Sequence, residues 1–453
     1  MWNSSYKSVL WQIVLIPLTG FMLYMPFSKY ELWFFALPAF MLLLWQRKGV
    51  FWLISGFIFF FLSLRCANIA SIEYGGVNPF LSYTLFVPFS LFLSFYQFYM
   101  PLWICRRFFR NYLWALPLLY TAFEILRSHF PYGGFPWLLI GSLSVYIPLI
   151  KHSLLFINVY MQSLLLVFTA LLLPRRKLKP LIALWLIMAI TGLVALKEKE
   201  NRMEGARVIR VALVQTGVPQ KDKLDTSAFR RHAEEILRLT EEATGANADL
   251  VVLPESALHF FYSEESDDYN LWLRRLSFKT PILVGLIDIR EGLRPYNSAY
   301  LLKGGIAIGH YDKIRLFPIG EYMPFPFGFL KEFFPAISGI DYFPGKNLKP
   351  LEYGSMKIAT PICFEVAYHD LVERLSDRAN LIVVLTNDGW FEDSDCTHQH
   401  YLWARVRALE RGKYMLWVNN SGDTGIIDPM GRVLERMPYM KRGIVRSEVL
   451  LVE

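Results

Sequence analysis

Charged residues are scarce in this sequence of 453 residues. Asp, Glu, Lys and Arg make up 19% of the chain, whereas about 25% is typical of soluble globular proteins. Hydrophobic residues make up 54%, and the mean hydropathy is +0.31. This balance excludes a disordered chain, a coiled coil and an ordinary cytosolic enzyme.

Cysteine is scarce as well. The four cysteines are Cys66, Cys105, Cys363 and Cys396. None forms a CxxC pair, which argues against a disulfide scaffold and a zinc ribbon. We interpret Cys66 and Cys105, at the ends of apolar stretches, as small buried hydrophobic residues. The run 396–400 contains two histidines but has no second ligand pair at zinc spacing, so we predict no metal site there.

The basic charge is confined to the apolar half of the chain. Residues 1–200 contain 16 Lys and Arg against 5 acids, a balance of +11. Residues 201–453 contain 31 against 34, a balance of −3. A nucleic-acid-binding protein would instead gather Lys and Arg on its folded domain, so we expect no nucleic-acid partner. Loops beside a membrane explain the pattern better.

Residues 1–200 are predicted to form a membrane domain. A helix of about 20 apolar residues crosses a hydrocarbon core of ~30 Å. We predict about seven such transmembrane helices, near residues 8–26, 31–46, 49–66, 79–104, 112–127, 154–173 and 180–196.

The loops between these segments differ in charge. Alternate loops collect nine basic residues: Arg47, Lys48, Arg106, Arg107, Arg110, Arg175, Arg176, Lys177 and Lys179. The side that carries them is predicted to be cytoplasmic. The N-terminus then lies inside, and an odd number of spans places residues 201–453 outside.

The stretch 124–141 interrupts the apolar pattern with Glu124, Arg127 and a run rich in Gly and Pro. Two interpretations are open. An ionisable pair at membrane depth often marks a functional site. Alternatively, Glu124 and Arg127 lie three apart on one helix face and simply neutralise each other.

Beyond residue 200, short apolar runs alternate with helical patterns, which predicts an α/β domain over residues 201–453. We expect strands near 208–214, 250–253, 282–285, 299–302, 358–363 and 381–385. We expect helices near 227–243, 266–278, 369–378 and 399–411.

Three reactive side chains accompany these elements: Glu255, Lys313 and Cys363. A glutamate takes the proton of a thiol as general base. A lysine stabilises the thiolate and then the oxyanion of a tetrahedral intermediate. Taken singly, a cysteine after a strand is commonly a core residue and a glutamate there a cap or surface acid. Spacing alone leaves both interpretations open.

The segments 253–256, 311–313 and 362–365 resemble the carbon–nitrogen hydrolase (nitrilase) superfamily, whose catalytic set is Glu-Lys-Cys in that order. The chain resembles most closely that superfamily's membrane-embedded branch, the apolipoprotein N-acyltransferase family. Further segments that carry this resemblance are 124–137, 212–220, 313–325, 386–391 and 399–410. The motifs occur in order over nearly the whole chain.

The resemblance implies a nitrilase-like α-β-β-α sandwich for the α/β domain. It implies Cys363 as nucleophile, Glu255 as general base and Lys313 as electrostatic stabiliser.

The same resemblance implies three supporting residues. Glu321 would hold Lys313 or the base in place, and Glu365 would be a supporting acid. The amide N–H of Phe364 would complete an oxyanion hole with Lys313.

The implied reaction moves an acyl chain from a phospholipid to Cys363 as a thioester, and then to the N-terminal diacylglyceryl-cysteine amine of a lipoprotein. It requires no cofactor or metal. The implied location is the bacterial inner membrane, with the catalytic domain on the periplasmic side. One alternative is a membrane-tethered carbon–nitrogen hydrolase of amidase or nitrilase type. Another is a transporter or sensor with an inactive outer domain, against which the complete reactive set argues.

Two positions depart from the family's pattern. The family usually has a last membrane span after the catalytic domain, whereas residues 446–453 contain no long apolar run. The family also commonly has a Trp where this chain has Leu224.

Segment 322–344 is unusually aromatic and includes Phe325, Phe327 and Phe329. These rings are interpreted either as core residues or as a hydrophobic arm. Such an arm would enter the outer leaflet beside the active site and admit a lipid acyl chain.

Overall fold

The computed structural model describes residues 4–46, 48–225, 227–245, 247–258, 261–262, 268–290, 293–333 and 341–453. The chain forms two compact units. The helical unit comprises Met1–Ile72, Val77–Ala195 and Ser394–Gln399. The α/β unit comprises Glu73–Gly76, Leu196–Asp393 and His400–Glu453.

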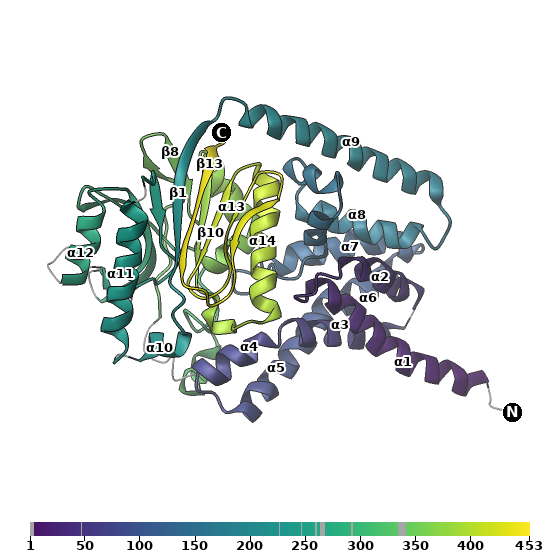
Figure 1. Cartoon of the computed structure of the whole chain (residues 1–453). Helices are drawn as coiled ribbons and strands as arrows, with labels where there is room; N and C mark the ends of the chain where they lie inside the picture. The colour runs from purple at the N-terminus through teal and green to yellow at the C-terminus, as the bar shows by residue number, and fades with distance from the viewer. Residues whose placement is uncertain are drawn as a thin grey trace. The chain divides into compact units, whose positions relative to one another are not determined.

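Helices coincide with each of the apolar stretches found in the sequence (Figure 1). They are α1 (Ser4–Tyr24), α2 (Ala36–Trp45), α3 (Gly49–Ser63), α4 (Cys66–Ile69), α5 (Pro79–Ser94), α6 (Met100–Phe108), α7 (Tyr112–Arg127), α8 (Val159–Leu172) and α9 (Leu178–Met203). A π-helical turn joins α5 to α6, so that both form one helix of 30 residues.

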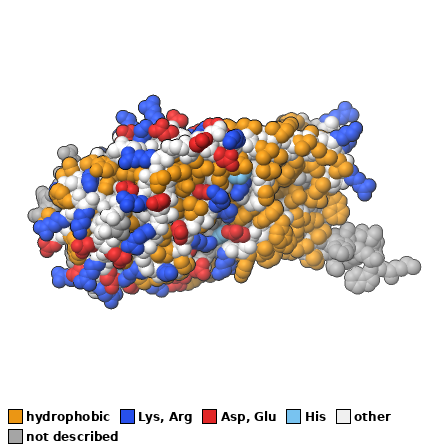
Figure 2. Space-filling view, turned by 45° about the horizontal axis from the view of Figure 1, so that its top comes forward, with side chains coloured by type: hydrophobic (Ala, Val, Ile, Leu, Met, Phe, Trp, Pro, Cys, Tyr) orange, Lys and Arg blue, Asp and Glu red, His pale blue; other side chains and the backbone are white. Residues whose placement is uncertain are grey.

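Within the described part of the chain, two helices are long and apolar enough to cross a membrane, Pro79–Phe108 and Leu178–Met203. A third is added if the bent pair Gly49–Ser63 and Cys66–Tyr74 forms one span. Seven crossings therefore stay a prediction. Figure 2 shows hydrophobic side chains covering much of the surface over the helical unit, as expected of a membrane protein.

Glu124 and Arg127 are both buried near the end of α7. The Arg127 guanidinium donates to the carbonyl oxygens of Phe135 and Trp137, each at 2.8 Å. A Glu124 carboxylate oxygen accepts from the Ile140 N–H at 3.0 Å. These contacts fasten the segment after α7 to the helix, and they favour a structural role for both charged residues.

The α/β unit contains two sheets. Their strand orders are β13-β1-β2-β4-β5-β6, with β3 paired to β4, and β12-β11-β10-β9-β8-β7. The strands are β1 (Arg207–Gln215), β2 (Leu250–Val252), β3 (Phe261–Tyr262), β4 (Ile282–Arg290), β5 (Arg294–Lys303), β6 (Ile306–Asp312), β7 (Leu351–Tyr353), β8 (Met356–Ala359), β9 (Leu381–Thr386), β10 (Met415–Asn419), β11 (Thr424–Ile427), β12 (Val433–Met437) and β13 (Gly443–Leu451).

Helices cover the outer faces of these sheets (Figure 1). They are α11 (Phe229–Gly245), α12 (Asp268–Leu276), α13 (His369–Ser376) and α14 (Asp395–Arg411), and the short α10 (Gln220–Leu224) lies at one end of the unit. Ile236 and Leu237 of α11 share one buried cluster with Val251 of β2. On the other sheet, Tyr401 of α14 packs edge-on against Trp417 of β10. The predicted α-β-β-α sandwich is therefore confirmed.

Parallel strands lie at the centre of both sheets. β1, β2 and β4 are parallel to one another, and so are β8, β9 and β10. All six residues of β9 are buried, as expected for parallel strands covered on both faces. Side chains at the carboxyl ends of such strands converge from distant parts of the chain.

A disulfide joins Cys66, at the start of α4, to Cys396, in the first turn of α14. This corrects the interpretation of Cys66 as a simple buried hydrophobic residue. Beside the disulfide, the Gln399 side chain donates to the carbonyl oxygen of Phe27 at 3.0 Å. Gln399 also accepts from the indole N–H of Trp137 at 2.8 Å. The first turn of α14 is therefore fixed within the helical unit.

The disulfide leads to a direct prediction. Denatured but unreduced protein should react with maleimide at two of its four cysteines, Cys105 and Cys363. Exchanging both Cys66 and Cys396 for Ser should lower the free energy of unfolding by about 2–4 kcal/mol, because the crosslink is lost. Intact mass and thermal unfolding measure these effects, with Cys105→Ser as the control. Four maleimide adducts on unreduced protein would contradict the bond.

Candidate active site

The three predicted catalytic residues converge from both sheets. Glu255 follows β2 and Lys313 follows β6, whereas Cys363 follows β8 and begins a short 3-10 turn. Lys313 Nζ lies 3.5 Å from Glu255 Oε1. The charges of both residues also act on the Cys363 sulfur. The set is therefore brought together across two stacked sheets.

The backbone is unusual at two points of the site. Cys363 has φ of 54°, and Ser256, which follows Glu255, has φ of 45°. A left-handed backbone at a non-glycine residue costs about 1–3 kcal/mol and is concentrated at active sites. Gly285 of β4 allows a close approach, because a Cβ there would lie 2.6 Å from the Glu255 Cα.

A second carboxylate holds Lys313. Glu321 Oε1 lies 2.9 Å from Lys313 Nζ, closer than Glu255 does. The other Glu321 oxygen accepts from the Phe317 N–H at 2.7 Å. Glu321 thus has the contact with Lys313 that the family resemblance implied for it.

Asn297 of β5 contacts the carboxylates of Glu255 and Glu321. No role for it was predicted from the sequence. Its Nδ2 donates to Glu255 Oε1 at 2.7 Å and to Glu321 Oε1 at 2.8 Å. Its backbone carbonyl accepts from the Lys313 N–H at 2.9 Å. One residue therefore aligns the base with the lysine. The available signal was a polar residue within a stretch of β5 that is mostly buried.

Glu365 connects the loops of the two sheets. Its Oε1 accepts from the N–H groups of Ile314 and Arg315 at 2.7 and 2.9 Å. Its Oε2 accepts from the Ile362 N–H at 2.8 Å, and the Tyr311 hydroxyl contacts both oxygens. Burial raises the pKa of Glu365 to about 7, against the effect of its hydrogen bonds. Glu365 therefore hydrogen-bonds to the loop after β6 and to the loop after β8, and holds them together.

Electrostatics set the resting state of the site. Burial lowers the pKa of Lys313, but the carboxylates of Glu321 and Glu255 outweigh it and raise that pKa well above its usual range. Burial and the charge of Glu255 raise the pKa of Cys363 well above its usual range, although Lys313 opposes them. At neutral pH the site therefore holds an ammonium and a neutral thiol, which needs a base.

The Phe364 ring fixes the turn after the thiol. It packs against Phe317 and Tyr368, with ring centroids 5.1 and 5.5 Å away. The role of the Phe364 N–H as an oxyanion donor stays a prediction.

The aromatic segment is largely exposed. The exposed fractions are 89% for Phe325, 66% for Phe329 and 39% for Phe327. These values rule out core packing for Phe325 and Phe329. Residues 334–340 of this segment, and the side chain of Leu224, lie outside the described part of the structure.

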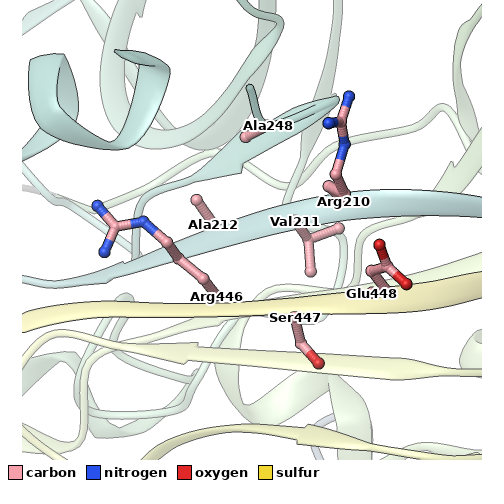
Figure 3. A pocket seen from close by; sticks show the side chains of 7 residues that line it. All are labelled: Arg210, Val211, Ala212, Ala248, Arg446, Ser447 and Glu448. Atoms are coloured by element: carbon pink, nitrogen blue, oxygen red, sulfur yellow. The ribbon is translucent and has the colours of Figure 1, made fainter. Parts of the chain in front are cut away.

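A pocket of about 240 Å³ lies elsewhere, beside the paired strands β1 and β13 (Figure 3). Its lining residues are Arg210, Val211, Ala212, Ala248, Arg446, Ser447 and Glu448. Arg210 pairs with Asp249, and Arg446 pairs with Glu242. No predicted catalytic residue lines it, so this pocket is separate from the site.

Among the residues that the structure describes, no group of three or more His, Cys, Asp and Glu is arranged to hold a metal ion. Two residues of the run 396–400 make other contacts. Cys396 is in the disulfide, and His400 Nδ1 lies 2.7 Å from Asp388 Oδ1.

Two family models divide the chain. The carbon–nitrogen hydrolase model matches residues 210–452, and that of the apolipoprotein N-acyltransferase N-terminal domain matches residues 19–172. An apolipoprotein N-acyltransferase of Aquifex aeolicus is 43% identical, over 94% of this chain and 96% of its own length. This chain belongs to the apolipoprotein N-acyltransferase family. Another apolipoprotein N-acyltransferase, from Azotobacter vinelandii, is 32% identical over 83% of this chain and 76% of its own.

Membership of the apolipoprotein N-acyltransferase family confirms the expectation of an acyltransferase, in preference to a membrane-tethered hydrolase. It also confirms a membrane-associated enzyme. Among solved structures, an amidase from Nesterenkonia sp. is 20% identical, covering 53% of this chain and 90% of its own, with a TM-score of 0.41. That similarity is too low to support a conclusion about function.

The contacts of Asn297 predict a kinetic effect. Asn297→Ala removes a donor shared by two carboxylates, and a hydrogen bond to a charged group is worth about 1.5–3 kcal/mol. We expect acyl-enzyme formation on Cys363, followed by intact mass, to slow by roughly 10–100-fold. Asn380→Ala is the matched control, because Asn380 is equally buried but bonds only to backbone groups at the far end of β8. Equal rates in both variants would show that Asn297 does not align the site.

Proposed function

We propose that this chain transfers an acyl chain from a phospholipid, through a thioester on Cys363, to the N-terminal diacylglyceryl-cysteine amine of lipoproteins. The observation that carries the proposal is the pair of buried residues Glu255 and Lys313 beside the half-buried Cys363, in a chain of this family. The names of its relatives supply the class of acceptor.

In the first step, Glu255 takes the Cys363 thiol proton while the sulfur attacks the ester carbonyl of the phospholipid. The Lys313 ammonium and the Phe364 N–H stabilise the oxyanion. Collapse of the intermediate breaks the ester C–O bond, and Glu255 returns the proton to the departing alcohol oxygen. A thioester on the enzyme and a lysophospholipid result.

In the second step, the lipoprotein amine attacks the thioester carbonyl. Glu255 takes a proton from the attacking nitrogen. The C–S bond then breaks with its electron pair on sulfur, and Glu255 returns the proton to Cys363. The products are an amide on the lipoprotein and the free thiol, so the enzyme is regenerated without a cofactor.

We place the catalytic residues on the periplasmic side of the bacterial inner membrane. The nine basic residues of alternate loops favour this orientation. The Cys66–Cys396 disulfide supports it independently, because disulfides persist in oxidising compartments. The predicted topology places both cysteines outside the cytoplasm.

The exposed rings support a lipid substrate. We assign Phe325, Phe327 and Phe329 to a lipid-contacting arm beside the active site. Rings this exposed form an apolar patch in water, but they gain free energy of burial when acyl chains surround them.

Covalent catalysis is tested by intact mass after incubation with phospholipid. Wild-type protein should gain one acyl group on Cys363, and Cys363→Ala should gain none. Glu255→Gln removes the general base, and Lys313→Ala removes the cation that stabilises the oxyanion. Each should slow acylation at least ~10²-fold. Cys105→Ala, which removes the other free thiol, is the control. Normal transfer by Cys363→Ala would refute the proposal.

The arm is tested by exchanging exposed rings. Phe325→Ser with Phe329→Ser removes two apolar side chains, each worth roughly 1.5–3 kcal/mol when buried in lipid. The melting temperature in detergent should stay nearly unchanged, because both rings are exposed. Transfer from phospholipid should fall at least several-fold, while acylation by a short soluble ester should persist. A large loss of melting temperature, or equal loss with both donors, would contradict the arm.

A further inference from the structure

Thr386, the last residue of β9, lies beside the nucleophile. An isolated parallel bridge pairs Ile362 with Leu385. Cys363 follows Ile362 and Thr386 follows Leu385. The two residues therefore lie next to each other, just beyond the paired positions. Thr386 is fully buried. Its hydroxyl faces the Cys363 side chain, and hydrogen bonding from it acts to lower the pKa of the thiol.

The same hydroxyl has a second acceptor. Thr386 Oγ1 lies 3.3 Å from Asp388 Oδ1. A threonine hydroxyl has a single proton, and an ionised carboxylate only accepts. Thr386 therefore donates fully either to Asp388 or to the Cys363 sulfur.

Asp388 does not depend on Thr386 for its hydrogen bonds. His400 Nδ1 lies 2.7 Å from Asp388 Oδ1, and Asn419 Nδ2 lies 2.6 Å from Oδ2. Because the carboxylate accepts, His400 carries its proton on Nδ1. All three side chains are buried. Two donors thus remain on Asp388 when the Thr386 proton leaves it.

Four groups act on the Cys363 sulfur from the elements packed around it. The carboxylates of Glu255 and Asp388 disfavour a negative charge there, and the ammonium of Lys313 favours one. Thr386 is the uncharged donor. Thr386 is thus the second group, beside Lys313, that favours a negative charge on the sulfur.

We propose that Thr386 is a switching hydrogen-bond donor for the catalytic sulfur. Its proton faces Asp388 while Cys363 is a thiol or thioester, and it turns to the sulfur whenever the sulfur carries the negative charge. Asp388, His400 and Asn419 are positioning residues that hold the alternative acceptor in place. The inference rests on the proposed function only in taking Cys363 as the nucleophile.

The switch acts at two moments of the reaction. In acylation it stabilises the sulfur as Glu255 removes the thiol proton. In transfer to the amine, the C–S bond breaks and its electron pair passes to sulfur. The Thr386 hydroxyl then donates a hydrogen bond, without giving up its proton, until Glu255 reprotonates the sulfur.

The test uses alkylation of Cys363 by iodoacetamide in the full-length protein in detergent, followed by intact mass from pH 6 to 10. The reagent reacts with the thiolate. Thr386→Val keeps the shape and removes the hydroxyl. It should slow alkylation about tenfold at pH 8 and move the inflection to higher pH by about one unit. Thr386→Ser keeps the hydroxyl and removes the methyl group, and it should resemble wild type.

The pair of variants separates hydrogen bonding from packing. A normal alkylation rate in Thr386→Val would overturn the proposal. Equal slowing in Thr386→Ser would overturn it too, because the loss of the methyl group, and not of the hydroxyl, would then explain the slower alkylation. The reagent needs no lipid. A wild-type protein that gains no acyl group from phospholipid would therefore refute the proposed function while leaving the alkylation result intact.

The positioning residues are tested with His400→Phe. Phenylalanine retains a ring against Trp417, whose centroid lies 4.6 Å from that of His400, but it lacks the Nδ1 donor. Asp388 should then retain the Thr386 proton, and alkylation should slow several-fold at an unchanged melting temperature. An unchanged rate would remove His400 from the switch.

Discussion

One buried carboxylate, that of Glu365, connects the two loops that carry the catalytic residues. The base and the lysine belong to the first sheet and the thiol to the second, so neither sheet alone holds the catalytic set. Glu365 accepts from the backbone on both sides, at Ile314 and Ile362. Removing it would leave buried donors unpaired, each costing about 1–3 kcal/mol.

Ion pairs and hydrogen bonds explain why the buried Lys313 and the nearby acids are tolerated together. Glu255 and Glu321 share the Lys313 ammonium and the Asn297 amide, so each carboxylate has a charged partner and a neutral donor. Buried charges are retained only when they are paired and hydrogen-bonded in this way. The same arrangement leaves the Cys363 thiol neutral at rest, so the reactive sulfur anion arises only when Glu255 accepts its proton.

Much of the fold and the catalytic set could be predicted from sequence, because both depend on local patterns. Buried strands such as β9 are continuous apolar runs, and Cys363 lies within a distinctive motif. None of the strands β10 to β13 was predicted: four of the five residues of β12 are exposed, which leaves no apolar pattern, whereas the buried run of β10 was simply missed. Asn297 and Thr386 could not be assigned, since their contacts arise only when strands from distant parts of the chain pair. The Cys66–Cys396 disulfide spans 330 residues, so spacing carried no signal for it.

Helix α14 has a practical consequence for protein engineering. The segment Ser394–Gln399, which includes the start of this helix, belongs to the helical unit, whereas the rest of the helix carries His400 next to Asp388. A soluble fragment cut at residue 200 would lose Cys66 and the partners of Gln399. It would expose a thiol and an unpaired amide at the start of that helix. Truncation for crystallisation or inhibitor screening therefore needs this turn redesigned, with Cys396 and Gln399 replaced by residues suited to water.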